Sequence, residues 1–193
     1  MLTFSIMEET MNKDVLKVLL SEEELNATVD RLATQINRDY ESHAKRLILL
    51  GILKGSVVFM GDLMKKVDSS IVEIDFMKVS SYGSGTKSSG AVNIILDIQR
   101  KDIAECDILI VEDIVDSGRT LSYLVEYLRL KGAKSVRTCA LLDKPSRREV
   151  DFNLDYVGAQ IPDEFVVGYG LDYDEKYRNL PYIGILRPEV YSK

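Results

Sequence analysis

Two adjacent carboxylates, Glu112 and Asp113, stand at the end of an apolar run of the chain. The run 108–111 is typical of a buried strand. The short segment 117–120 that comes after it is rich in small polar residues. Hydroxyls and free backbone N–H groups at the start of a helix suit a phosphate, because the helix dipole favours negative charge there. Carboxylates suit Mg²⁺ or sugar hydroxyls. The chemistry predicted here is the binding of a phosphorylated sugar with a metal ion.

A polar turn between a strand and a helix is common in α/β proteins and by itself indicates little. Consecutive residues of a strand point to opposite faces of a sheet, so either Glu112 or Asp113 faces a layer that is ordinarily apolar. A carboxylate in that layer is unfavourable unless something binds it. We therefore favour a ligand site over a purely structural turn.

The elements that must position these residues follow from hydrophobic periodicity, which predicts strands alternating with helices. Helices are predicted at 21–40, where Ser21 and Glu24 fit a capping box, at 55–67, and at 120–131. Strands are predicted at 46–52, 71–80, 91–96, 107–111, 135–142, 165–169 and 182–186. This alternation predicts an α/β fold with a mostly parallel, doubly wound sheet flanked by helices. Its ligands should bind at the carboxyl ends of the strands, where Lys54, Glu112 and Lys144 fall.

Composition limits the classes of function. The chain has 193 residues, of which 46% are hydrophobic and 29% are charged, which fits one globular domain. The net charge of −6 disfavours broad binding to nucleic acid or to an anionic membrane surface. No apolar stretch approaches the ~20 residues that a membrane-spanning helix needs.

The chain carries few cysteine and histidine residues, the types that zinc sites and His-based catalysis use. Cys106 and Cys139 are the only cysteines and are expected to be ordinary, partly buried thiols. His43 is the sole histidine and is expected to be solvated, which argues against a His-based triad. Residues 1–13 are expected to be a flexible extension; no secretory signal is evident in them, so the expected location is cytoplasmic. Met11 is an alternative start to Met1.

The segment 82–90 is rich in glycine and in hydroxyl residues and is predicted to be a mobile loop. It is the part of the chain nearest to a dinucleotide-binding loop. It lacks the third glycine and the following helix that such loops need, which disfavours a nicotinamide-dependent dehydrogenase.

The run 111–118 resembles the phosphoribosyl-pyrophosphate (PRPP) motif of the type I phosphoribosyltransferases, in the form found in their 6-oxopurine branch, the bacterial-type hypoxanthine and hypoxanthine–guanine enzymes. Segments 53–56, 80–83, 142–145 and 162–169 match further motifs in the family's order. The resemblance covers about residues 14–187. It implies the type I phosphoribosyltransferase fold as a single domain, residues 14–193, with a small hood from the two ends of that domain and the mobile loop.

The resemblance also implies an activity. The family transfers the 5-phosphoribosyl group of PRPP to N9 of hypoxanthine or guanine, giving IMP or GMP and pyrophosphate, with Mg²⁺ as cofactor. It implies a homodimer or homotetramer without nucleic-acid or membrane partners. Two alternatives stay open: xanthine as the base, and a regulator that senses PRPP and binds nucleic acid.

Site residues carry over by position in the motifs. Asp116 matches the family's catalytic aspartate, which takes a proton from purine N7; on position alone it could be a helix N-cap. Glu112 and Asp113 would hold the ribose hydroxyls and help to place Mg²⁺. The 5′-phosphate would be wrapped by Ser117, Gly118, Arg119 and Thr120, with no firm role for the Arg119 side chain.

Two further groups match the pyrophosphate and purine ends of the site. Lys54 and Gly55, after a Leu53–Lys54 peptide that can be cis in this family, match the pyrophosphate loop, and Arg178 matches a cation for the pyrophosphate. Asp172 matches a second Mg²⁺ ligand, and Ser81 and Tyr82 would close over the reaction as part of the mobile loop. The purine side comprises Lys144, which would donate to O6, Phe165, which would stack on the ring, Val166, which would meet its edge, and Ile114. A donor at O6 would disfavour adenine, whose amino group leaves the lysine unpaired.

Overall fold

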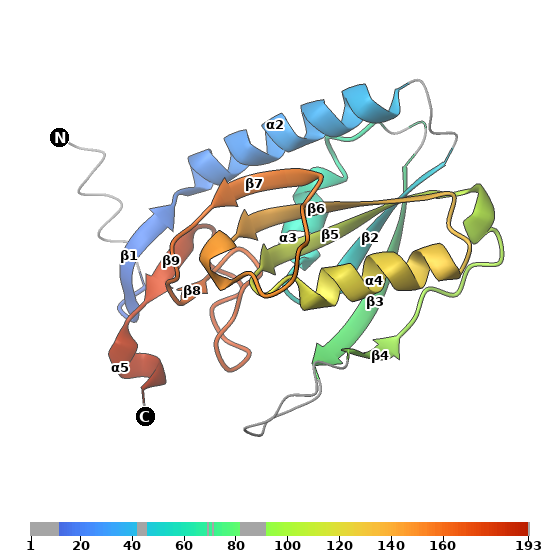
Figure 1. Cartoon of the computed structure of the whole chain (residues 1–193). Helices are drawn as coiled ribbons and strands as arrows, with labels where there is room; N and C mark the ends of the chain where they lie inside the picture. Colours follow the sequence, from blue (N-terminus) through green and yellow to red (C-terminus); the bar gives the residue numbers. More distant parts are fainter. Residues whose placement is uncertain (1–11, 42–45, 69, 71, 82–91, 193) are drawn as a thin grey trace.

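A six-stranded sheet forms the centre of the part of the chain that the computed structural model describes, residues 12–41, 46–68, 70, 72–81 and 92–192. The strand order is β4-β3-β2-β5-β6-β7 (Figure 1). All neighbouring strands pair in parallel except β4, which runs antiparallel to β3. Their bounds are β2 Leu47–Leu53, β3 Val72–Ser81, β4 Val92–Leu96, β5 Asp107–Val115, β6 Ser135–Asp143 and β7 Tyr156–Gln160.

Helices cover both faces of this sheet, which confirms the doubly wound arrangement (Figure 1). Helices α2 (Glu22–Tyr40) and α3 (Val57–Leu63) pack on one face against Leu49 and Leu109. Helix α4 (Arg119–Leu130) packs on the other face against Leu50 and Ile110. Adjacent residues of β2 and β5 therefore point to opposite apolar layers, as the alternation of side chains along a strand requires.

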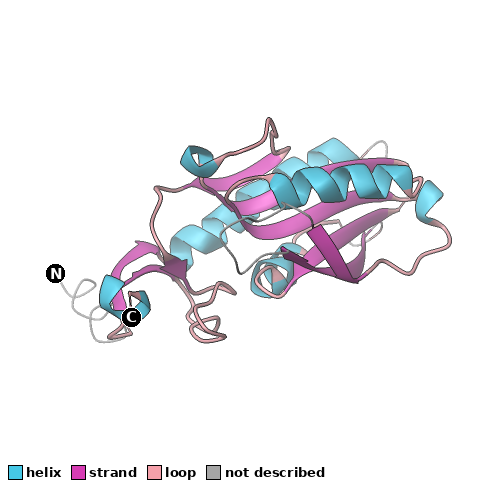
Figure 2. Cartoon of the chain, turned by 60° about the horizontal axis from the view of Figure 1, so that its bottom comes forward, coloured by secondary structure: helices cyan, strands magenta, loops and turns pink. Residues whose placement is uncertain are grey.

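A second, three-stranded sheet lies at the side of the molecule where the two ends of the described chain meet (Figure 2). Its order is β1-β9-β8, with β1 Val15–Leu20, β9 Ile183–Leu186 and β8 Val166–Val167. The short helix α5 (Pro188–Tyr191) follows β9. This sheet joins segments that are far apart in sequence, and it has its own small apolar core. The division into residues 1–13 and 14–193 stays a prediction.

Most predicted elements are confirmed, with shifted ends. Ser21 and Glu24 form the capping box: the Glu24 backbone N–H donates to Ser21 Oγ, and the Ser21 N–H donates to the Glu24 carboxylate. Helix α4 ends before Gly132, which has a φ of 92°. Helix α3 is shorter than predicted, and β1 and β7 were not predicted. No helix among the described residues is long and apolar enough to cross a membrane.

Two sequence-based expectations are wrong. The strand at 107–111 continues through the carboxylates to Val115, because Glu112 and Ile114 keep their ladder pairing with β6. Cys106 and Cys139 are fully buried rather than partly buried. Burial raises the pKa of the Cys139 thiol far above its usual value, so this thiol stays protonated.

Candidate active site

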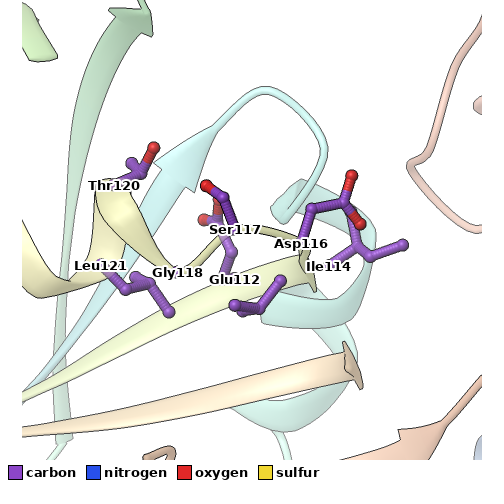
Figure 3. Close-up of a pocket in the computed structure, with 8 residues that line it drawn as sticks. Glu112, Ile114, Asp116, Ser117, Gly118, Thr120 and Leu121 are labelled. Carbon is purple, nitrogen blue, oxygen red and sulfur yellow. The ribbon is translucent and has the colours of Figure 1, made fainter. Parts of the chain in front are cut away.

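The turn from β5 into α4 forms a small cavity of about 150 Å³ at the carboxyl end of the sheet (Figure 3). The N-cap of α4 is Gly118, whose φ of 79° lies in the left-handed region that favours glycine. Asp116 is therefore not the helix cap. The Ser117 hydroxyl accepts a hydrogen bond from the Arg119 N–H at 3.3 Å. The lining residues are Glu112, Ile114, Val115, Asp116, Ser117, Gly118, Thr120 and Leu121.

Residues that follow β6 hold this turn in place, and sequence reasoning missed them. The Arg148 guanidinium donates to the Asp116 carbonyl at 2.6 Å and also pairs with Asp143. The Glu149 N–H donates to the Ser117 carbonyl at 3.0 Å. The only signal in the sequence is the basic pair Arg147–Arg148, which resembles an ordinary surface segment.

Glu112 is half-buried in β5, and its Oε2 atom is fully buried. Its Oε2 accepts no hydrogen bond within the described structure. Burial, with the neighbouring charge of Asp113 adding to it, raises the pKa of Glu112 well above its usual range. A buried acceptor of this kind can receive hydroxyls from a ligand that enters the cavity it lines.

Asp113 lies against the loop that follows β2. Burial raises the pKa of Asp113 to about 6. A Cβ placed on Gly55 would lie 1.6 Å from Asp113 Oδ2, so only glycine lets the two segments approach this closely. The preceding Leu53–Lys54 peptide is cis. Gly55 therefore lies directly beside one of the predicted metal ligands.

A larger cavity of about 440 Å³ adjoins the first, and Ile114 and Asp116 line both. Lys144 is only 8% exposed at its side chain, and its Nζ lies 3.7 Å from Asp116 Oδ1 and 3.9 Å from Asp163 Oδ1. Both distances are longer than the donor–acceptor distance of a hydrogen bond. The lining residues are Asp113, Ile114, Asp116, Lys144, Arg147, Phe165, Val166, Leu171 and Asp172.

The predicted purine-side residues come together in this cavity. Figure 3 shows Asp116 and Ile114 next to each other at one side of the first cavity, and these two residues also line the second one. Phe165 is 38% exposed, and Val166, which begins β8, is buried. Arg147, which the sequence analysis did not single out, also lines the cavity and donates to Asp163 at 3.0 Å.

The predicted pyrophosphate cations meet a carboxylate that was not predicted. Lys54 Nζ lies 2.9 Å from Glu175 Oε2, and Arg178 lies 3.4 Å from the same oxygen. Arg178 also pairs with Asp172 at 2.8 Å and donates to the Gly170 carbonyl. The Glu175 carboxylate thus lies between these two cations.

The three predicted metal ligands do not form a cage by themselves. Among the described residues, no group of three or more histidine, cysteine or carboxylate side chains converges as a metal site. Glu112 and Asp113 leave the strand on opposite sides, and Asp172 is paired with Arg178. The partnerless Glu112 oxygen and the buried Asp113 still fit Mg²⁺, which proteins commonly bind through one or two carboxylates plus phosphate oxygens of a substrate.

Some predicted residues lie partly or wholly outside the described part of the chain. The Ser81 backbone pairs with Val92 at the end of β3. Tyr82, the predicted mobile loop at 82–90, and His43 fall outside the described residues. Their predicted roles stay predictions.

Comparisons with known proteins agree with this geometry. The chain is 52% identical over 182 residues to a hypoxanthine-guanine phosphoribosyltransferase of Bacillus subtilis, covering 94% of this chain and 99% of that protein. It is 53% identical over 185 residues to the bifunctional protein TilS/HprT of Listeria monocytogenes, but spans 28% of the length of that relative. A solved hypoxanthine phosphoribosyltransferase of Staphylococcus aureus superposes with a TM-score of 0.87 at 49% identity, covering 97% of this chain and 98% of that one.

The phosphoribosyl transferase domain family matches residues 17–174, a range that includes every residue lining the two cavities. The chain therefore belongs to the phosphoribosyl transferase domain family and has the type I phosphoribosyltransferase fold.

Proposed function

We propose that this protein transfers the 5-phosphoribosyl group of PRPP to N9 of hypoxanthine, and of guanine, giving IMP or GMP and pyrophosphate in purine salvage. The observation that carries the proposal is that Asp116 lines both cavities. One cavity has the hydroxyls and the helix start that suit a 5′-phosphate, and the other has the lysine and the aromatic ring that suit a 6-oxopurine. The bond between C1 of the ribose and the base would form where they join.

Asp116 is the proposed acid–base group. As the purine nitrogen attacks C1, the base becomes more acidic, and a carboxylate within reach of N7 can take its proton. Lys144 would donate to O6 from its buried position, since its ammonium group has no partner within hydrogen-bond distance among the described residues. With adenine bound, the Lys144 ammonium would face the 6-amino group, which is also a donor, so adenine is disfavoured.

The phosphate groups of PRPP would be held at two places. Ser117 and Thr120, with the backbone of Gly118 and Arg119, would bind the 5′-phosphate at the start of α4. Lys54, Gly55 and Arg178 would bind the pyrophosphate, with Lys54 and Arg178 exchanging their ion pairs with Glu175 for contacts with the ligand. Ser81 and Tyr82 would close over the reacting groups and exclude water.

Glu112, Asp113 and Asp172 would hold Mg²⁺ together with oxygens of PRPP, and Glu112 and Asp113 would also receive the ribose hydroxyls. When bound, Mg²⁺ supplies positive charge to the pyrophosphate that leaves. A homodimer or homotetramer is part of the same proposal and follows from the family alone; sedimentation of the purified chain tests it. A cytoplasmic site of action also belongs to the proposal, because PRPP and nucleotides are too highly charged to cross a membrane unaided.

The test is nucleotide formation from PRPP and Mg²⁺ with hypoxanthine, guanine, xanthine and adenine in parallel, using the wild type and Asp116→Ala. We expect turnover of hypoxanthine and guanine, little with adenine, and a kcat in the variant lower by about 10²–10⁴-fold. PRPP binding by calorimetry should persist in the variant. Exclusive turnover of xanthine would replace the proposed base. Binding of PRPP with no turnover of any base would contradict the proposal and favour the regulator.

A further inference from the structure

We propose that Tyr191, in the C-terminal helix α5, is a positioning residue of the base site: it stacks on one face of Phe165 and holds that ring so that its other face can receive the purine. This inference rests on the proposed function, because it assigns the free face of Phe165 to the base.

The geometry of the stack carries the proposal. The ring centroids of Phe165 and Tyr191 are 4.8 Å apart, and the ring planes are inclined by 21°. Both values are typical of stacked aromatic pairs. Phe165 nevertheless remains 38% exposed and lines the larger cavity. Tyr191 is not among the described residues that line this cavity, so it covers Phe165 from outside the site.

A third ring fixes the orientation of the first two. Tyr173 meets Phe165 edge to face, with centroids 5.6 Å apart and planes at 86°, and it also contacts Tyr191 at 6.5 Å. Phe165 directly precedes β8, Tyr173 lies between β8 and β9, and Tyr191 ends α5. Phe165 therefore contacts two other rings, which restrict its rotation away from the cavity.

The position of Tyr191 depends on the small sheet rather than on α5 itself. A helix of four residues is too short to be stable alone. The Arg187 N–H donates to the Asp14 carbonyl at 2.9 Å, and Arg187 Nε donates to the Lys13 carbonyl at 3.0 Å. Strand β9 pairs with β1 just before this point. The two ends of the described chain thus place Tyr191 behind Phe165.

A ring that is held in place loses less conformational freedom when a base stacks on it, and such preorganisation increases affinity. Among the described residues, the ring contacts of Tyr191 are with Phe165 and Tyr173, neither of which is proposed to bind PRPP, so its effect should be confined to the base. Its hydroxyl donates no hydrogen bond that the structure shows within the described residues, which indicates that the ring is the part that matters.

The experiment compares Tyr191→Ala, Tyr191→Leu and Tyr191→Phe in the full chain, measuring KM for hypoxanthine, KM for PRPP, kcat and the melting temperature. We expect KM for hypoxanthine to rise by roughly 3–10-fold in the Ala and Leu variants. KM for PRPP and kcat should stay within about twofold, and Tyr191→Phe should keep wild-type values.

Tyr123→Ala is the matched control. Tyr123 stacks on Tyr127 on the surface of α4, with centroids 6.1 Å apart, and lines neither cavity among the described residues. Its removal should leave KM for hypoxanthine unchanged. If Tyr191→Ala does not fold, Tyr191→Leu, which keeps apolar volume but removes the ring, decides the question.

An unchanged KM for hypoxanthine in the folded variant would overturn the inference. A lower KM would also overturn it, because it would mean that Tyr191 competes with the base for Phe165. A parallel rise of both KM values with a fall in kcat would indicate a general structural role instead. Absence of turnover in the wild type would overturn the proposed function itself, and the role of Tyr191 with it.

Discussion

Charged side chains near the amino ends of the central strands form one closed network, whereas those at the carboxyl ends differ: Lys54 is paired with Glu175, but Glu112 Oε2 and Lys144 have no partner within hydrogen-bond distance among the described residues. Before β2 and β5, Arg46 lies 2.8 Å from Glu73 and 2.6 Å from Asp102. Arg100 lies 2.8 Å and 3.1 Å from the same two carboxylates. Two cations and two anions form a closed network there, and it ties the segment before β5 to the start of β3.

The carboxyl ends leave similar groups without such partners. Glu112 Oε2 is buried and accepts no hydrogen bond within the described structure. The buried Lys144 has carboxylates no nearer than 3.7 Å. Unpaired buried polar groups reduce stability, and they persist where a ligand completes them. We infer that the amino ends of the sheet are closed by ion pairs that add stability, whereas the carboxyl ends keep polar groups available for a ligand.

The largest effect is expected from a substitution at the carboxyl ends of the strands, where the loop after β2 packs against Asp113. Gly55→Ala would place a Cβ 1.6 Å from Asp113 Oδ2, so the loop or the carboxylate must move. We expect turnover to fall by about 100-fold or more, because displacement of reacting groups by ~1 Å can have that effect. Steady-state kinetics with hypoxanthine and PRPP measure it.

Gly61→Ala is the control for this substitution. A Cβ on Gly61, within α3, meets nothing within 4 Å. It should therefore leave turnover unchanged and raise the free energy of unfolding by about 0.5–1 kcal/mol, since alanine favours a helix over glycine. Wild-type turnover in Gly55→Ala would show that the contact with Asp113 is not needed.

The same substitution at the two ends should change stability in opposite directions. Glu112→Gln removes a buried charge that lacks a partner, so we expect the free energy of unfolding to stay level or rise by about 1 kcal/mol. PRPP affinity should fall by about 10-fold or more, because an ionised acceptor for the ribose is lost. Urea unfolding followed by far-ultraviolet circular dichroism and calorimetry with PRPP measure the two effects.

Glu73→Gln removes a carboxylate that binds two guanidinium groups at the closed end. We expect a loss of roughly 0.5–1 kcal/mol in stability and no change in PRPP affinity. If both variants lost stability equally, the distinction between the two ends would not hold.

The sequence predicted the fold and part of the candidate site, but not the residues that act through tertiary contacts. The doubly wound sheet was predictable because the apolar runs at 46–52 and 107–111 are long and alternate with helical patterns. Asp116, Lys144 and Phe165 could be found because they lie in contiguous motifs. Glu175 and Arg148 could not, since each acts through a tertiary contact with a residue some 30 or more positions away. Tyr191 lies at the end of the chain, where periodicity gives no signal.

A smaller effect should appear as acid sensitivity of the closed end. The guanidinium groups of Arg100 and Arg46 lower the pKa of Asp102 to about 2 and hold that of Glu73 below its usual value. Because folding lowers these pKa values, the stability they add is fully present above the unfolded value of ~4 and is lost as the pH falls toward about 2. Melting temperatures measured between pH 5 and pH 2 should fall less steeply for Asp102→Asn than for the wild type. Equal slopes would show that the network does not respond to acid in this way.

The smallest effect concerns Arg119, whose side chain has no firm role at the open end. It is 50% exposed and pairs with Glu149, itself exposed, at 2.6 Å, so it points along the surface rather than into the phosphate cavity. An exposed pair of this kind contributes little, roughly 0–1 kcal/mol. In Arg119→Ala we expect KM for PRPP to stay within about twofold of the wild type, since the backbone N–H at this position is retained. A rise of KM above about tenfold would mean that Arg119 leaves Glu149 to bind the 5′-phosphate, as we propose Lys54 and Arg178 leave Glu175 for the pyrophosphate.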